Sequence, residues 1–135
     1  MRIRDIFESF NNIAVYGMSR HIEKAAFTVP SYMKKQEYKV IPINPSVDSI
    51  MKEQAYPDIM SVPDNIEILL VFRPASEAVD IVKKAIERKN AKGDIKVIWL
   101  QLGIVNDEAK ELAEENGIEF VQDKCMYVEH KEVYA

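Results

Sequence analysis

The sequence lacks the features of a disulfide-stabilised or membrane-spanning protein. Its 135 residues contain one cysteine, Cys125, so no disulfide can form within the chain, and we expect a cytoplasmic protein. Its longest uncharged apolar runs, such as 68–72, fall far short of the roughly 20 residues that span a bilayer. The first ten residues lack the apolar core and small-residue cleavage site of a secretory signal. We therefore expect no membrane partner.

Positive charge is also scarce. The chain has 18 Lys and Arg against 22 Asp and Glu, a formal net charge of -4 at pH 7. Nucleic acid is an unexpected partner, because that affinity comes mainly from many cations that neutralise backbone phosphates. Any anionic ligand must be held by a local group of cations.

Catalytic and metal-binding patterns are missing as well. The two histidines, His21 and His130, have no serine or carboxylate partner at a catalytic spacing. With the single cysteine they also show no recurring spacing of metal ligands. We expect no catalytic residue and no metal site.

What is present has the composition of one globular domain. Hydrophobic residues make up 47% of the chain and charged residues 30%, and 135 residues suffice for one hydrophobic core. We expect a single domain over residues 1–135, with an N-terminal helix at about 1–11 and a C-terminal tail at about 126–135.

Five short segments are rich in β-branched and aromatic residues and are typical of strands. Most carry apolar residues at consecutive positions, the pattern of strands buried on both faces of a parallel sheet. These segments are 13–16, 39–43, 66–72, 95–100 and 118–121.

Helical patterns lie between the strands. Residues 75–89 and 106–116 carry apolar stripes at helical spacing, and 25–37 is a weaker helix in which Pro30 must lie in the first turn or kink it. We also expect a short helix at 46–54. This alternation predicts a Rossmann-like, doubly wound α/β fold: a five-stranded parallel sheet of order 3-2-1-4-5 with helices on both faces.

In such a sheet, ligands bind beyond the C-terminal ends of the strands, where the winding reverses. The first strand is followed by Gly17-Met18-Ser19-Arg20 and, after a few residues, Lys24. The glycine allows a close turn, Ser19 and the following amides can donate to phosphate, and Arg20 and Lys24 add charge. The alternative is a tight turn with solvated cations.

The second strand is followed by Asn44-Pro45. A nicotinamide dinucleotide enzyme normally has an acidic residue here, whereas neutral Asn44 tolerates a phosphorylated ribose. The dipeptide is equally typical of a plain turn. An NAD(P)- or nucleotide-binding enzyme domain is therefore an alternative, which the missing G-x-G-x-x-G pattern disfavours.

The third and fourth strands also end in candidate ligand contacts. In Phe72-Arg73-Pro74, Phe72 can line a purine ring, Arg73 can reach a phosphate and Pro74 pre-sets the turn. A buried phenylalanine and a solvated arginine are the alternative. Gln101 and Gly103 offer a polar side chain and a close backbone approach.

Together these motifs resemble the small stand-alone CoA-binding proteins, a family similar to the N-terminal CoA-binding domain of the succinyl-CoA synthetase alpha subunit. The resemblance covers about residues 12–130. It implies a domain that binds coenzyme A or acyl-CoA, with phosphates at Gly17 to Lys24 and adenosine near Phe72 to Pro74. The motifs that carry it are Gly17-Met18-Ser19-Arg20, Val40-Ile41-Pro42-Ile43-Asn44-Pro45, Val71-Phe72-Arg73-Pro74, Trp99-Leu100-Gln101-Leu102-Gly103-Ile104 and Asp123-Lys124-Cys125-Met126.

The resemblance implies no ligase activity, because the phosphorylated histidine of the synthetase belongs to a further domain. We expect a carrier, sensor or partner rather than an enzyme. A protein-interaction module with a vestigial pocket is another alternative, in which Phe7, Tyr127 and Val128 are exposed for a homodimer or another protein partner. Cys125, after the fifth strand, is predicted to form a mixed disulfide with the CoA thiol under oxidising stress.

Overall fold

The computed structural model describes residues 1–135, and at its centre lies a parallel β-sheet. The strands of this sheet are β1 (Asn12–Tyr16), β2 (Lys39–Ile43), β5 (Ile68–Val71), β6 (Val97–Leu100) and β7 (Glu119–Val121). Strands β5 and β6 are buried along their whole length, which explains their unbroken apolar sequences. The α/β class and the five-stranded parallel sheet expected from the sequence are confirmed.

The strands lie in the order β2-β1-β5-β6-β7. Tyr56 forms an isolated parallel bridge with Ile43 beside β2, and when it is counted as position three the expected order 3-2-1-4-5 runs from Tyr56 to β6, with β7 as a sixth position. The segment that becomes β5 was expected to be strand three, and this assignment is wrong: β5 pairs with β1 in the middle of the sheet. The loops that follow β1 and β5 are therefore direct neighbours.

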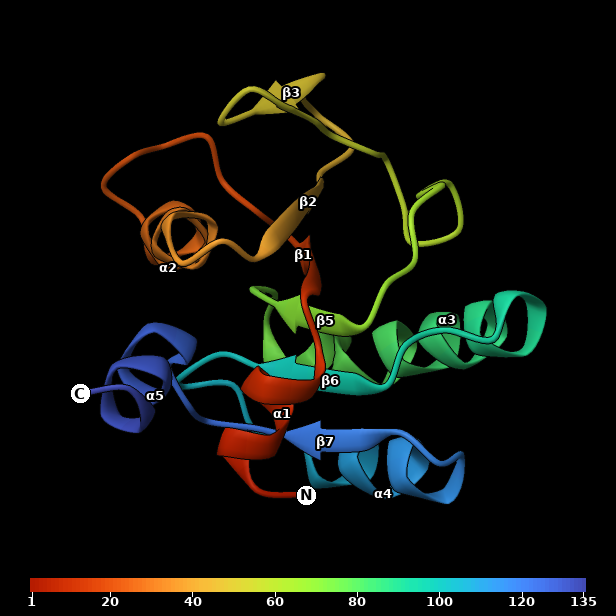
Figure 1. Ribbon diagram of the computed structural model, residues 1–135. Helices are drawn as coiled ribbons and strands as arrows, with labels where there is room; N and C mark the ends of the chain where they lie inside the picture. The colour runs from red at the N-terminus through yellow and green to blue at the C-terminus, as the bar shows by residue number, and fades with distance from the viewer.

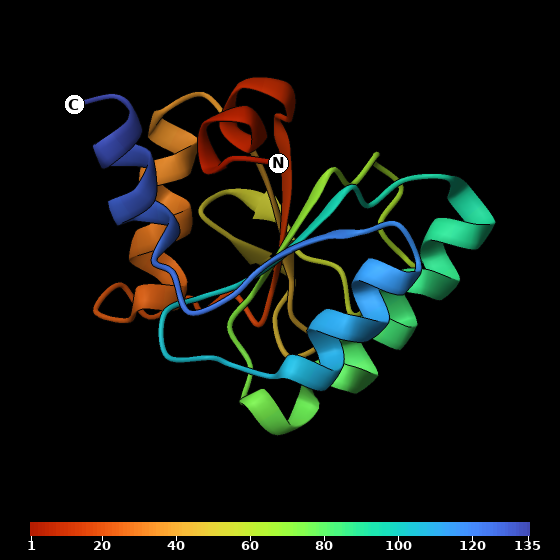
Figure 2. The same cartoon turned by 90° about the horizontal axis from the view of Figure 1, so that it is seen from below.

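Helices cover both faces of the sheet, as Figures 1 and 2 show. One layer contains α1 (Ile3–Ser9), α2 (Ala25–Lys35) and α5 (Met126–Val133). The other contains the short 3-10 helix η1 (Ala75–Glu77), α3 (Ala78–Lys92) and α4 (Asp107–Glu115). Alternate residues of each strand face opposite layers and form two separate hydrophobic cores. None of the helices has the length and hydrophobicity that crossing a bilayer requires.

The helix expected at 46–54 is wrong. This segment forms an antiparallel hairpin of β3 (Ser49–Ile50) and β4 (Glu53–Gln54). Met51 and Lys52 make the two-residue turn with φ of 53° and 64°, the left-handed conformation that tight hairpins require. Ile50 is buried in the core, and its burial anchors the hairpin.

Within the C-terminal segment expected as a tail lies the helix α5, which packs on α2. Met126 and His130, four residues apart, are its buried side chains. Nδ1 of His130 lies 2.8 Å from the hydroxyl oxygen of Tyr32 on α2. Phe7, expected to be exposed, is buried against Trp99 and His130, whereas Val128 is exposed as expected.

Candidate functional site

A cleft of about 680 Å³ lies at the C-terminal ends of β1, β2 and β5. The helices that follow β1 and β5 cover opposite faces of the sheet, so the cleft lies where the winding reverses. Nine of the twelve predicted binding residues line it: Gly17, Met18, Ser19, Arg20, Lys24, Asn44, Pro45, Phe72 and Arg73.

Gly17 lets the loops after β1 and β5 approach each other. Its N–H donates to the carbonyl of Ile43 at 3.1 Å, and its φ is +85°. A Cβ at this position would lie 2.8 Å from the carbonyl oxygen of Phe72 and 2.9 Å from Cδ of Arg73. Only glycine combines this conformation with this proximity.

The loop after β1 is tied to α2 through a carbonyl group that proline leaves free. Pro30 lies inside α2 rather than in its first turn, and it has no N–H to donate to the carbonyl of Ala26. The N–H of Ser19 donates to that carbonyl instead, at 3.1 Å. The hydroxyl oxygen of Ser19 accepts the N–H of His21 at 3.0 Å. The hydroxyl hydrogen of Ser19 thus stays available to a ligand.

Asn44 connects the loops after β1 and β2. Its Nδ2 donates to the carbonyl of Met18 at 2.9 Å, and its Oδ1 accepts the N–H of Ser46 at 2.8 Å. A carboxylate could accept from Ser46 but could not donate to Met18. This requirement for a donor explains why the residue after β2 is an amide rather than an acid.

Arg73, at the end of β5, lines the cleft together with Glu77 of η1. Its Nε and Nη2 donate to the two carboxylate oxygens of Glu77 at 3.1 and 2.8 Å. This bidentate hydrogen bond raises the pKa of Arg73 and lowers the pKa of Glu77. The guanidinium in the cleft wall therefore already has a partner.

Four predicted contacts lie outside the cleft lining. Pro74 precedes η1 as its N-cap residue. Gln101 is buried and accepts the N–H of Met126 at 3.3 Å, and Gly103 donates its N–H to Asp123 at 2.8 Å. Cys125 is half-buried at the N-cap of α5 and packs against the core on that side. Gln101, Gly103 and Cys125 belong to the junction between the loop after β6 and α5.

Several residues of the cleft wall were not predicted from the sequence. Glu77 lies four residues after Arg73, and this spacing at a helix start was a usable signal for an ion pair. Ser46 and Val47 come from the region wrongly expected to be helical, and Pro57 follows the β3–β4 hairpin. His21 was noted only as a non-catalytic histidine in the phosphate loop.

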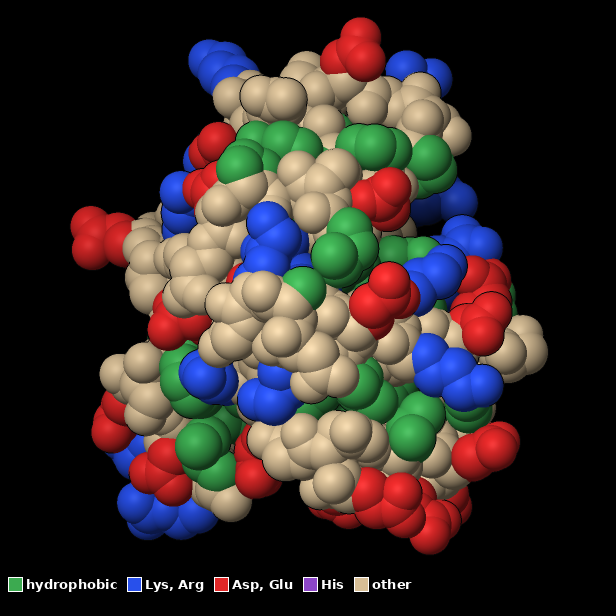
Figure 3. Space-filling model, turned by 90° about the vertical axis from the view of Figure 1, so that its right-hand side faces the viewer, with side chains coloured by type: hydrophobic (Ala, Val, Ile, Leu, Met, Phe, Trp, Pro, Cys, Tyr) green, Lys and Arg blue, Asp and Glu red, His purple; other side chains and the backbone are tan.

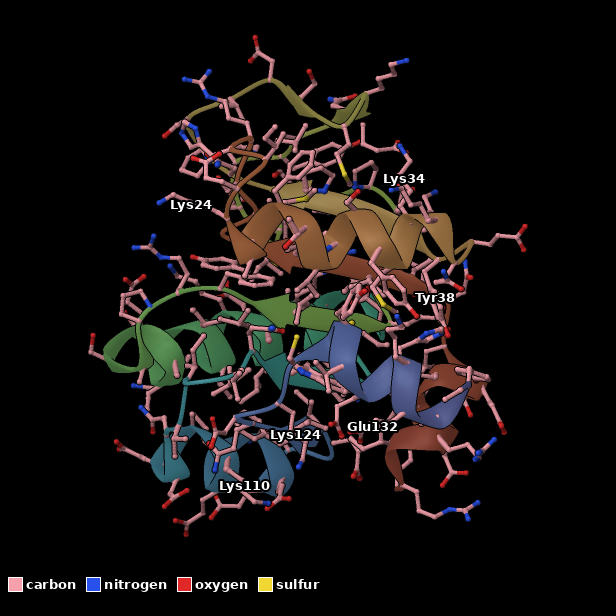
Figure 4. The ribbon with its side chains drawn as sticks, turned by 90° about the vertical axis from the view of Figure 1, so that its left-hand side faces the viewer. Lys24, Lys34, Tyr38, Lys110, Lys124 and Glu132 are labelled. Carbon is pink, nitrogen blue, oxygen red and sulfur yellow. The ribbon has the colours of Figure 1, made fainter.

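The positive charges of the cleft are local. Arg20, Lys24 and Arg73 line it, and Figure 4 shows Lys24 at the opposite end of α2 from Lys34 and Tyr38. Elsewhere the surface is mixed. Figure 3 shows positive and negative side chains interspersed over the face formed by α3 and α4. The cleft thus combines several cations within a chain of net charge -4.

The sequence matches the CoA binding domain family over residues 11–131. It is 29% identical over 128 residues to YneT, an uncharacterized protein of Bacillus subtilis, a match that covers 95% of this chain and 91% of YneT. It is also 29% identical over 95 residues to the ADP-forming acetate–CoA ligase II of Archaeoglobus fulgidus. That match covers 69% of this chain but 14% of the ligase.

Solved structures show the same architecture. A hypothetical protein from Pyrococcus horikoshii superimposes with a TM-score of 0.90 at 31% identity and covers 98% of this chain and 90% of its own. A protein from Thermus thermophilus superimposes with a TM-score of 0.89 at 31% identity, covering 97% and 96%. The fold is thus shared over almost the whole length of each chain.

Proposed function

The chain belongs to the CoA binding domain family, and on this premise we propose that it binds coenzyme A or an acyl-CoA in the cleft at the C-terminal ends of β1, β2 and β5. We propose further that it carries out no catalysis of its own. The observation that carries the proposal is the convergence of three loops, distant in sequence, on one cleft that contains Arg20, Lys24 and Arg73.

The chemistry of coenzyme A fits this arrangement. Its pyrophosphate and its 3'-phosphate are anions that an uncharged metabolite could not supply as partners for the cations of the cleft. The loop from Gly17 to Lys24 is the proposed pyrophosphate site, where the Ser19 hydroxyl and the Arg20 side chain donate. Phe72, half-buried in the cleft wall, offers an apolar surface to the adenine ring.

A binding role is supported by the extent of the matches. The Archaeoglobus ligase shares only 14% of its length with this chain. The relative matched over almost its full length, YneT, is uncharacterized. The proposed cleft holds donors and cations but no nucleophile paired with a base. We therefore propose a carrier, sensor or partner role for the bound CoA compound.

Calorimetric titration of the purified protein with CoA, dephospho-CoA, NAD and ATP tests this proposal. Tightest binding of CoA is expected, and weaker binding of dephospho-CoA would show that the 3'-phosphate is recognised. Preference for NAD would favour a dinucleotide-binding domain instead. Absence of heat with all four ligands, confirmed by NMR titration, would leave the cleft without the proposed function.

A further inference from the structure

We propose that Glu77 competes with the phosphate of a ligand for Arg73 and so limits how tightly the cleft binds phosphate compounds. Both carboxylate oxygens of Glu77 accept from the Arg73 guanidinium, so a ligand gains from Arg73 only if it offers an anion that replaces the carboxylate. This inference rests on the proposed function in one respect: the ligand that enters the cleft carries phosphate.

The position of Arg73 is fixed by the packing of its stem. Its Cγ and Cδ lie 3.3 and 2.9 Å from the point where a Gly17 Cβ would stand, so the stem lies directly against the loop after β1. The backbone of Glu77 is also held, because its N–H donates to the carbonyl of Pro74 at 2.9 Å and the next residue, Ala78, is buried. Only the outer parts of the two side chains are free to separate.

Because both side chains are exposed to solvent, separating Arg73 from Glu77 costs little free energy. The Arg73 and Glu77 side chains are 46% and 40% exposed. Ion pairs with this exposure contribute little to stability, because water solvates both charges once they part. Glu77 can therefore swing into solvent when a stronger partner for Arg73 arrives.

Phosphate is such a partner. A phosphate group presents two oxygens to the guanidinium with the same bidentate geometry as a carboxylate, and a phosphomonoester carries more negative charge. A neutral part of a ligand, such as a ribose hydroxyl or an amide, cannot replace the carboxylate on equal terms. Glu77 thus competes with the phosphate of a ligand for Arg73, and phosphate is the group that can displace it.

The spacing alone would not support this inference. Lys110 and Glu114 form a similar pair four residues apart on α4, at 2.6 Å, but they lie outside the cleft. The Arg73–Glu77 pair differs because both residues line the cleft beside the loop after β1. A competing anion at that place necessarily meets both charges.

The test compares Glu77→Gln with the wild-type protein and with Glu87→Gln, which removes the same charge from an exposed position on α3 outside the cleft. The probes are CoA by calorimetry, and inorganic pyrophosphate and adenosine by NMR titration. Glu77→Gln should tighten binding of CoA and pyrophosphate about two- to fivefold, as expected for release from an exposed ion pair. Glu87→Gln should change neither, and adenosine binding should not respond.

A double-mutant cycle with Arg73→Ala separates competition for Arg73 from simple repulsion of the ligand. The gain from Glu77→Gln should fall to less than 1.5-fold once Arg73 is absent. An equal gain in the Arg73→Ala background, or none in the wild-type background, overturns the inference.

The probes also separate this inference from the proposed function. Pyrophosphate bound more tightly by Glu77→Gln, with CoA unbound, would retain the role of Glu77 and remove the assignment to CoA. Equal affinity of the wild-type protein and Glu77→Gln for CoA would retain the assignment to CoA and remove the role of Glu77. Failure of every phosphate compound to bind would overturn both.

Discussion

Arg88 and Asp94 form an ion pair in which both side chains are almost fully buried, 1% and 4% exposed. The Arg88 guanidinium also donates to three backbone carbonyls of the segment before β5, and Asp94 accepts the N–H of Ile66 in the same segment. The pair therefore fixes the chain as it enters β5, the strand that delivers Phe72 and Arg73 to the cleft.

Replacing Arg88 with alanine should lower the free energy of unfolding by about 3 to 5 kcal/mol. The change would leave the Asp94 carboxylate buried without its cation and three carbonyls without their donor. Urea denaturation measures the loss. Lys84→Ala, at an exposed position of the same helix, is the control and should change stability by less than about 0.5 kcal/mol. A loss below about 1 kcal/mol for Arg88→Ala would contradict the role assigned to the pair.

Gly17→Ala should separate the loops after β1 and β5 and weaken CoA binding at least tenfold. The added Cβ would meet the Phe72 carbonyl at 2.8 Å while the residue keeps a left-handed φ of +85°. Gly93→Ala is the matched control, because Gly93 has a φ of +76° with no atom within 4 Å of its Cβ position. It should lose stability but keep CoA affinity, and similar CoA affinities for the two variants would refute the argument.

Arg20→Ala should weaken CoA binding by about 1.5 to 3 kcal/mol if its guanidinium donates to a phosphate oxygen. Arg20 is exposed and has no salt-bridge partner within the chain, so its whole effect should appear in binding rather than in stability. Calorimetry at low and high salt measures it, since added salt screens an exposed contact of this kind. An unchanged affinity would remove Arg20 from the site.

His130 should make the protein less stable in mild acid. Burial lowers the pKa of His130 below its ordinary value of 6.5, so the unfolded chain binds a proton more readily than the folded one. The stability that the neutral, buried His130 contributes is fully present above pH 6.5 and is lost as the pH falls through its lowered pKa. Urea unfolding between pH 5.5 and about 7.5 measures how the free energy of unfolding changes with pH. This change should be smaller for His130→Gln than for the wild-type protein. Identical changes in the two proteins would exclude His130 as the cause.

The mixed disulfide between Cys125 and coenzyme A remains a prediction from the sequence. Incubation with oxidised CoA followed by intact-mass measurement should show one adduct, which Cys125→Ser removes. Cys125 lies at the N-cap of α5 and outside the cleft lining, so the pantetheine arm would have to extend from the cleft to the junction with α5. A wild-type protein without the adduct would end this hypothesis.

Much of the fold could be predicted because burial leaves a direct trace in the sequence. Strands buried on both faces must be apolar throughout, and β5 and β6 are. The hairpin at 49–54 was missed because Val47, Ile50 and Met51 repeat at helical spacing. Its left-handed turn, moreover, is made by Met51 and Lys52 rather than by Asn or Gly.

The candidate site shows the same limit. Gly17, Asn44 and Arg73, chosen because they follow strand ends, line one cleft, because parallel strands bring their C-terminal ends to one edge. The direction of a side chain beyond the strand could not be foreseen, and Gln101 turns inward to meet Met126. The pairing of Arg73 with Glu77 also depends on the three-dimensional structure, although the spacing of four residues is typical of an ion pair at a helix start.

The bridge between Ile43 and Tyr56 has a consequence for how the molecule behaves in a crowded solution. The N–H of Tyr56 donates to the carbonyl of Pro42, and the carbonyl of Tyr56 accepts the N–H of Asn44. Both groups point away from β1, and Pro42 has no N–H of its own. The β2 edge therefore leaves few backbone N–H and carbonyl groups unpaired, which disfavours pairing of β2 with a strand of another molecule. The cleft at the C-terminal end of β2 can therefore stay open without making the β2 edge a template for polymerisation.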